Sequence, residues 1–189
     1  MHASTPLTAQ LAQGAMTMKN NNPILLELLQ YKSWADQELM QCLCDNQDRL
    51  APQLLKKSVR LMNHIHVVDC IFSAHLSGQK HAFTSTNTDA TPEPETLTWA
   101  MQETNQALVE HLRSWHENEA NSRMHFEFTD GDPGSMSPTE MLLHVGVHST
   151  YHRGQVSQML KDAGIAPPRE LLSRKLHAQE PDRRKVDAC

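Results

Sequence analysis

Aromatic residues are scarce in this sequence, making up only 5% of the chain. Methionine, by contrast, occurs ten times in 189 residues, and leucine and alanine are plentiful. Leucine, alanine and methionine have high helix propensity, whereas aromatic residues are enriched in strands. The composition therefore favours a helical protein, and the length is typical of one domain.

Cysteine is also sparse, with four residues and no C-x-x-C spacing. Cys42 and Cys44 stand two residues apart in a helical pattern, so their side chains point about 160° away from each other. This arrangement predicts neither a disulfide framework nor a metal site built only from cysteines.

Long apolar runs and an excess of basic charge are missing too. No stretch approaches the roughly 18 apolar residues that are needed to span a membrane. Residues 1–16 have neither the basic region nor the continuous apolar run of a signal peptide. The net charge of −5 argues against a general nucleic-acid-binding surface, which needs a basic stripe. We therefore expect a cytoplasmic protein that binds neither membranes nor nucleic acids.

Helical periodicity of apolar residues recurs in four segments. Their approximate bounds are 23–45, 52–76, 94–118 and 138–162. The first begins at Asn22-Pro23, and the last follows Ser137, with Glu140 at the capping-box position. These long amphipathic helices predict an all-α four-helix bundle, in which the long polar second connection is compatible with a crossover.

Between the last two helices lies the only alternating segment, HFEF at 125–128, followed by the turn-rich DGDPG at 130–134. This pattern predicts a short β-hairpin or an extended loop. For the domain organisation we expect a flexible N-terminal tail at 1–18, the bundle at 19–168 and a charged C-terminal tail at 169–189.

The last helix carries three histidines four residues apart, His144, His148 and His152. Four residues turn a helix by about 400°, so the three side chains lie along one side. The apolar pattern places His152 inside the core-facing arc and His148 at its edge, whereas His144 falls outside and is interpreted as a rim residue. Two inward imidazoles one turn apart form half of a helical metal site.

The second helix supplies a candidate third ligand, His64, which also lies at the apolar edge of its helix. His75 shares this direction but lies about 16 Å further along the axis, and His66 points to the opposite side, where we expect it to be exposed. Buried imidazoles without partners cost roughly 1–3 kcal/mol each. A third inward histidine therefore favours a metal site over hydrogen-bonded core histidines.

Two stretches resemble the histidine motifs of the DinB family of metal-binding four-helix bundles, namely LMNHIHVVDCIFSAHLSG at 61–78 and LLHVGVHSTYHRGQVSQML at 142–160. The YKSWADQEL run in the first helix is similar to that family's first-helix pattern, and the H-x-x-x-H-R-G-Q element is fairly specific. The resemblance covers nearly the whole chain. It implies that the metal ligands are His64, His148 and His152.

Three histidine ligands leave at least one coordination position open for water or substrate, as in catalytic zinc sites. Such ligands suit one divalent ion of Zn, Ni, Fe or Cu, of which Zn or Ni is our first expectation. The resemblance implies proteins that include thiol-dependent transferases and isomerases using low-molecular-weight thiols, and it suggests a homodimer. Our first hypothesis is a metal-dependent transferase or hydrolase acting on a small molecule.

The alternative hypothesis is a non-catalytic metal-binding or stress-related interaction protein in which the metal is structural. No glutamate stands in an H-E-x-x-H frame, so the sequence identifies no catalytic acid or base. Gln155 projects inward beside His152 and is a candidate hydrogen-bond partner of a ligand. We expect Asp69 at the surface, and Gly154 where a neighbouring helix approaches closely.

Overall fold

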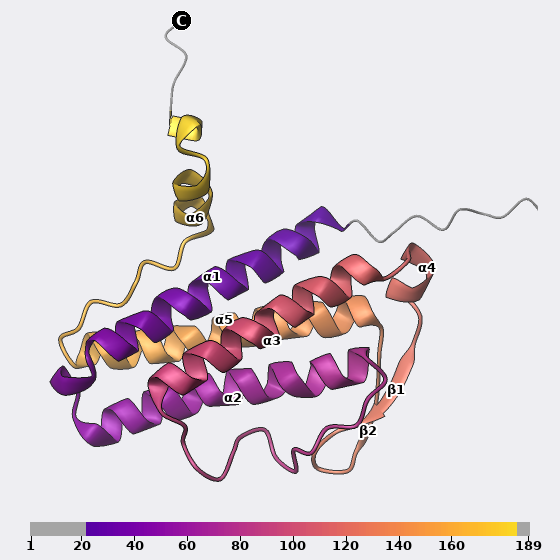
Figure 1. Ribbon diagram of the computed structural model, residues 1–189, viewed down its shortest axis with the longest axis horizontal. Coiled ribbons are helices and arrows are strands. Elements are labelled where there is room, and N and C mark those ends of the chain that lie inside the picture. Colours follow the sequence, from indigo (N-terminus) through magenta and orange to yellow (C-terminus); the bar gives the residue numbers. More distant parts are fainter. Residues whose placement is uncertain (1–21, 185–189) are drawn as a thin grey trace, which may run out of the picture.

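The computed structural model describes residues 22–184, so the predicted N-terminal tail 1–18 lies outside it. Four long helices dominate the fold (Figure 1), and they are α1 (Pro23–Asp45), α2 (Pro52–Leu76), α3 (Pro94–Ser114) and α5 (Pro138–Asp162). The predicted all-α bundle is therefore confirmed. Within the described part of the chain, no helix is long and apolar enough to cross a membrane.

Local sequence signals set the ends of these helices. The Asn22 side chain accepts a hydrogen bond from the Leu25 backbone N–H at 3.0 Å and caps α1. Ser137 and Glu140 form a reciprocal capping box at the start of α5. Just beyond α2 and α5, Gly78 and Gly164 adopt positive φ angles of 65° and 74°, a backbone conformation that glycine tolerates without strain.

Each long helix has two close neighbours in the bundle. Helices α1 and α2 both pack against α3 and α5, which leaves α1 diagonal to α2 and α3 diagonal to α5. Helices α1 and α5 run in one direction, whereas α2 and α3 run in the other (Figure 1). The connection 77–93 returns along the bundle to join the parallel helices α2 and α3, so it is a crossover.

The apolar core consists of two clusters at different heights in the bundle. One cluster contains Leu39, Met40, Leu43, Leu50, Val59, Met62, Ile65, Leu97, Met101, Val156, Leu160 and Ile165. The other contains Leu25, Leu29, Val68, Phe72, Leu76, Leu108, Leu112, Met141, Leu142 and Val145. Along α1, α3 and α5, the first cluster's residues lie on one side of a middle layer and the second cluster's on the other. That layer holds buried charges.

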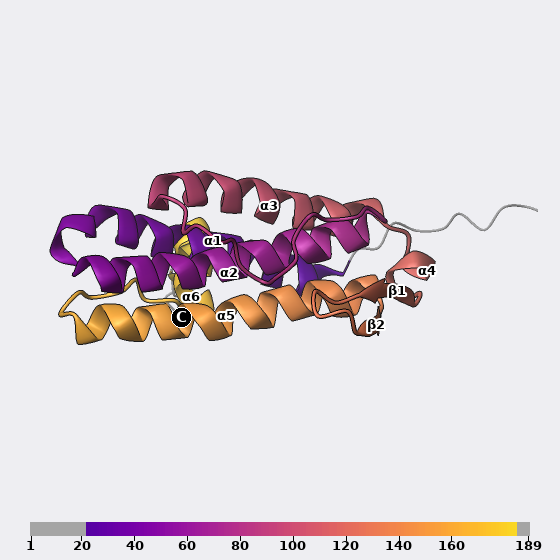
Figure 2. The ribbon, with the colours of Figure 1, turned by 90° about the horizontal axis from the view of Figure 1, so that it is seen from below.

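Helix α3 ends four residues before its predicted end, because Trp115 and His116 adopt extended backbone angles. The short α4 (Glu117–Ala120) and a hairpin follow (Figure 2). Strands β1 (Met124–Glu127) and β2 (Pro133–Met136) pair antiparallel, so the hairpin that the sequence offered as one alternative is formed. It lies at the end of the bundle where α2 ends and α5 begins.

The segment that we expected as a charged tail contains α6 (Leu172–Gln179) and a 3-10 turn, η2 (Pro181–Arg184); a further 3-10 turn, η1 (Gln47–Arg49), connects α1 to α2. Helix α6 packs on α1 through polar contacts. Lys175 is 2% exposed and donates a hydrogen bond to Glu27 at 2.6 Å. The Arg174 guanidinium lies 5.3 Å above the Trp34 ring.

Candidate metal centre

Helices α2 and α5 bring His64, His148 and His152 together. The Nε2 atoms of His64 and His148 are 3.0 Å apart, and the ring centroid of His152 lies 4.5 Å from that of His148 and 4.7 Å from that of His64. One ring nitrogen from each residue lies within 4.8 Å of the other two. The three histidines selected by helical geometry therefore form one cluster.

Hydrogen bonds fix the orientation of two of these rings. His64 donates from Nδ1 to the Thr86 carbonyl oxygen at 2.7 Å, and His152 donates from Nδ1 to Oε1 of Gln155 at 2.8 Å. Since both acceptors are oxygens, Nε2 of each ring keeps its lone pair. Metal-ligating histidines are held in this way, with the second nitrogen donating to a carbonyl or similar acceptor.

The electrostatics of the cluster favour neutral imidazoles at His64 and His148. Burial lowers the pKa of His148, and the neighbouring His152 and His64 act in the same direction, so that the pKa falls to about 3. Burial likewise lowers the pKa of His64. Neutral imidazole is the form that binds metal ions. The separation of 3.0 Å between Nε2 atoms also fits two ligands of one ion, since metal–nitrogen bonds of about 2.0–2.1 Å place adjacent nitrogens roughly 3 Å apart.

A pocket of about 270 Å³ begins at this cluster. Its walls are largely apolar and include Val68, Ile71, Phe72, Phe126 and Phe128, with His64 and His148 at one end. His144, which we interpreted as a rim residue, also lines the pocket. Its ring lies 5.5 Å from that of His148 and 4.9 Å from that of Phe72. The cluster thus adjoins a space that a small molecule could fill.

Two residues of α2 lie where the sequence did not place them. Asp69, expected at the surface, is 2% exposed, and His66, also expected to be exposed, is half-buried against Thr104 of α3. Burial lowers the pKa of His66 to about 4. Because α2 packs on α3 as well as on α5, it has a second buried side, which a single apolar arc does not reveal.

The surroundings of Gly154 also differ from the prediction of a closely approaching helix, because a methyl group added there would meet no atom within 4 Å. The close approach of α1 to α5 is instead at Gly146. A Cβ at that position would lie 2.8 Å from Cδ2 of Leu28.

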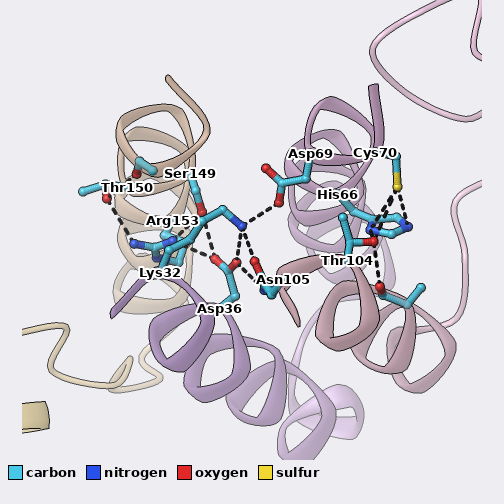
Figure 3. A network of polar contacts seen from close by, with 12 residues as sticks. Lys32, Asp36, His66, Asp69, Cys70, Thr104, Asn105, Ser149, Thr150 and Arg153 are labelled. Atoms are coloured by element: carbon cyan, nitrogen blue, oxygen red, sulfur yellow. Dashed lines mark hydrogen bonds and ion pairs between the residues drawn. The ribbon is translucent and has the colours of Figure 1, made fainter. Parts of the chain in front are cut away.

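The sequence analysis missed a buried network of charged and polar side chains in the middle layer (Figure 3). Lys32 of α1 donates to Asp36 at 2.8 Å, to Asn105 of α3 at 2.6 Å and to Asp69 of α2. Arg153 of α5 donates to Asp36 at 2.7 Å. The network therefore links all four long helices. Its only sequence signal is the i, i+4 spacing of Lys32 and Asp36.

The two carboxylates of the network are held differently. Burial raises the pKa of Asp36, but Lys32 and Arg153 outweigh it and bring the value down to about 2. Among residues 22–184, Asp69 pairs only with Lys32, so burial outweighs this pairing and raises the pKa of Asp69 to about 7. Its Oδ1 atom is buried and has no hydrogen-bond partner within residues 22–184. Asp36 is therefore ionised at neutral pH, while Asp69 is close to its titration point.

Comparison with known proteins identifies the family. The model of the DinB family matches residues 16–184. A crystal structure of a DinB-like protein from Bacillus cereus is similar with a TM-score of 0.56 and 21% identity, covering 80% of this chain and 99% of that one. At this identity the likeness shows the fold alone. No curated protein matches. The family match spans most of the chain, and the protein belongs to the DinB family.

Proposed function

We propose that this protein is a metal-dependent enzyme that acts on a small molecule, with one divalent transition metal ion held by His64, His148 and His152. The reaction that we favour is a thiol-dependent transfer or a hydrolysis. The observation that carries the proposal is the convergence of three imidazoles, two of which line one end of an apolar pocket. Three-histidine sites with an open position are typical of catalytic rather than structural zinc.

When bound, the metal would act as a Lewis acid and lower the pKa of a coordinated water or thiol. The chain's own residues prepare the site for it. Thr86 and Gln155 fix the rings of His64 and His152 with Nε2 available, so little rearrangement is needed on binding. The aromatic walls of the pocket exclude water from a substrate beside the cluster.

The bundle's own contacts favour a catalytic metal over a structural one. The buried network joins all four long helices through protein atoms alone, and α2 and α5 share a large packed interface. A metal is therefore not needed to tie α2 to α5. Structural zinc sites, in contrast, supply folding free energy that the apoprotein lacks.

The metal content of the purified protein tests the proposal directly. We expect one Zn, Ni, Fe or Cu ion per chain, measured by mass spectrometry of the elements, and its loss in His64→Ala, His148→Ala or His152→Ala with helicity retained. His177→Ala, a change in α6, is the matched control and should retain the metal. Protein that neither carries nor binds a divalent metal would overturn the proposal.

Activity is tested with a panel of low-molecular-weight thiols and electrophiles, together with ester and amide substrates. We expect turnover by the metal-loaded protein that disappears with a chelator and returns when metal is added. Full metal occupancy without turnover of any member of the panel would favour the non-catalytic alternative.

We further propose that the protein forms a homodimer through the outer face of α5. Leu143, Val147 and Tyr151 follow one another at four-residue spacing and are 49%, 60% and 65% exposed. The molar mass in solution, measured by light scattering, should equal two chains for the wild type and one chain for Val147→Lys.

A further inference from the structure

The pocket beside the histidine cluster continues into a larger one of about 690 Å³. His75, Phe126, Phe128 and Thr129 line both spaces, so the two adjoin, and together they are called the groove. His64 stands at one end of the groove, and His75 follows it eleven residues later on the same side of α2. This spacing corresponds to about 16 Å along the helix axis. The groove is therefore long enough for an extended molecule.

Two elements outside the bundle form the walls of this groove. The connection 77–93 runs back along α2 and is held there by side chains, since Asn63 donates to Oγ1 of Thr88 at 2.7 Å and Asn87 donates to the Arg60 carbonyl oxygen at 3.0 Å. The hairpin supplies the facing aromatic wall through Phe126, whose ring lies 4.6 Å from that of His75. The groove is thus a built feature of the fold.

The far half of the groove contains two histidines whose inner nitrogens lack partners. The rings of His75 and His81 are 5.2 Å apart. Nε2 of His75 and Nδ1 of His81 are buried, and neither has a hydrogen-bond partner within residues 22–184. Leaving such a group unpaired costs roughly 1–3 kcal/mol. A ligand group that paired with both rings would recover this cost.

We propose that His75 and His81 bind the carboxylate end of the substrate. The apolar body of that molecule lies along Phe126 and Phe128, and its reacting end lies at His64 and His148. The last point rests on the proposed function, whereas the carboxylate subsite does not. Both nitrogens are buried in this structure, so the side chains of His75 and His81 turn toward the groove when the carboxylate binds.

The chemistry of the subsite matches a carboxylate. A neutral imidazole can donate one hydrogen bond, so two adjacent rings can serve the two oxygens of one carboxylate. Lys80 lines the same part of the groove and its positive charge favours an anion, while Glu127 lines it with the opposite charge. The charges of Lys80 and Glu127 oppose each other, so the preference for a carboxylate rests on the hydrogen bonds of the two imidazoles.

Titration with 4-phenylbutyrate and with its uncharged amide, 4-phenylbutanamide, tests the subsite on metal-free wild-type protein. We expect the acid to bind at least fivefold more tightly than the amide in calorimetry. His75→Phe and His81→Phe keep a ring but remove its nitrogens, so each should abolish the preference for the acid. His177→Phe, in α6, is the matched control and should leave the preference unchanged.

A second measurement does not depend on variants that fold. The imidazole nitrogen signals of His75 and His81 in 15N-labelled wild-type protein should shift with the acid and not with the amide. Equal binding of acid and amide, or an acid preference that survives in both variants, would overturn the subsite. The metal affinity of both variants is measured in parallel and should stay within twofold of the wild-type value. A failure of the proposed metal site is thereby distinguished from a failure of the carboxylate subsite.

Discussion

At the scale of single residues, Asp69 stands out among the acids of residues 22–184 because its pKa is strongly raised. Its folded-state pKa of about 7 lies far above the value of about 3.9 for an unfolded chain. Between these two values the folded state binds a proton that the unfolded state does not. The contribution of Asp69 to the free energy of unfolding therefore falls as the pH rises from about 4 to 7.

Asp69→Asn should remove this contribution. We expect the free energy of unfolding of the variant, relative to the wild type, to increase between pH 4 and 7 and then to level off. The difference between the two proteins is the informative quantity, because His66, whose pKa is lowered to about 4, gives the opposite slope in both. Urea denaturation at several pH values measures it. Parallel pH profiles for the two proteins would contradict the assignment.

The two glycines of α5 test how closely α1 packs on α5, because Gly146 faces Leu28 of α1 and Gly154 faces open space. Gly154→Ala places a methyl group in open space and should stabilise the protein by about 0.5–1 kcal/mol through helix propensity. Gly146→Ala gains the same propensity but forces Leu28 to move, so it should be less stable than Gly154→Ala by about 1 kcal/mol or more. Thermal denaturation compares the two, and equal melting temperatures would exclude a tight contact between α1 and α5.

The histidine cluster was predictable at this scale, whereas the network was not. His148 and His152 are one turn apart on one helix, so local geometry places them together, and His64 lies at the edge of an apolar arc like His148. The position of Asp69 depends on which helices flank α2. Periodicity within α2 does not contain that information, since Lys32 and Asn105 come from distant parts of the chain.

At the scale of elements, helix ends were predictable wherever a local residue decides them. Helices α1, α2 and α5 begin at prolines, and α2 and α5 end just before Gly78 and Gly164, so their bounds match the prediction. The end of α3 has no such residue, and the formation of α6 depends on contacts with α1, which is distant in the sequence. Trp115 turns out of α3 and packs its ring against His111, and α6 rests on α1.

The segment before α6 also closes over the buried network, and Glu170 carries this contact. Arg153 is fully buried and pairs with Glu170, which is 19% exposed. Glu170→Gln should cost about 1–3 kcal/mol of the free energy of unfolding, because the guanidinium loses a charged acceptor. Glu38→Gln, which removes the exposed partner of Arg174, is the matched control and should cost less than about 1 kcal/mol. Denaturant titration measures both, and equal effects would contradict a special role for Glu170.

At the scale of the whole molecule, the histidine cluster and the charge network occupy the same layer between the two apolar clusters. Ser149, which follows His148 on α5, donates to Asp36 at 2.8 Å, and Arg153, which follows His152, contacts the same carboxylate. The histidines thus lie on the side of α5 that faces α2, while the neighbouring core-facing side of α5 is anchored in the network. The positions of the histidines are therefore set by protein contacts before any metal binds.

This arrangement predicts how the protein responds to metal removal. Metal-free protein should keep its helical circular dichroism and a cooperative thermal transition, because neither the core clusters nor the network uses the metal. Adding Zn²⁺ or Ni²⁺ to a free concentration one hundred times the dissociation constant should stabilise it by about 2.7 kcal/mol. For a chain of this size that corresponds to a rise in Tm of several degrees. His152→Ala should fold equally well without metal and lose most of this rise. Loss of helicity in the metal-free wild type would contradict this prediction. It would show that folding needs a metal that ties α2 to α5, which is a structural role.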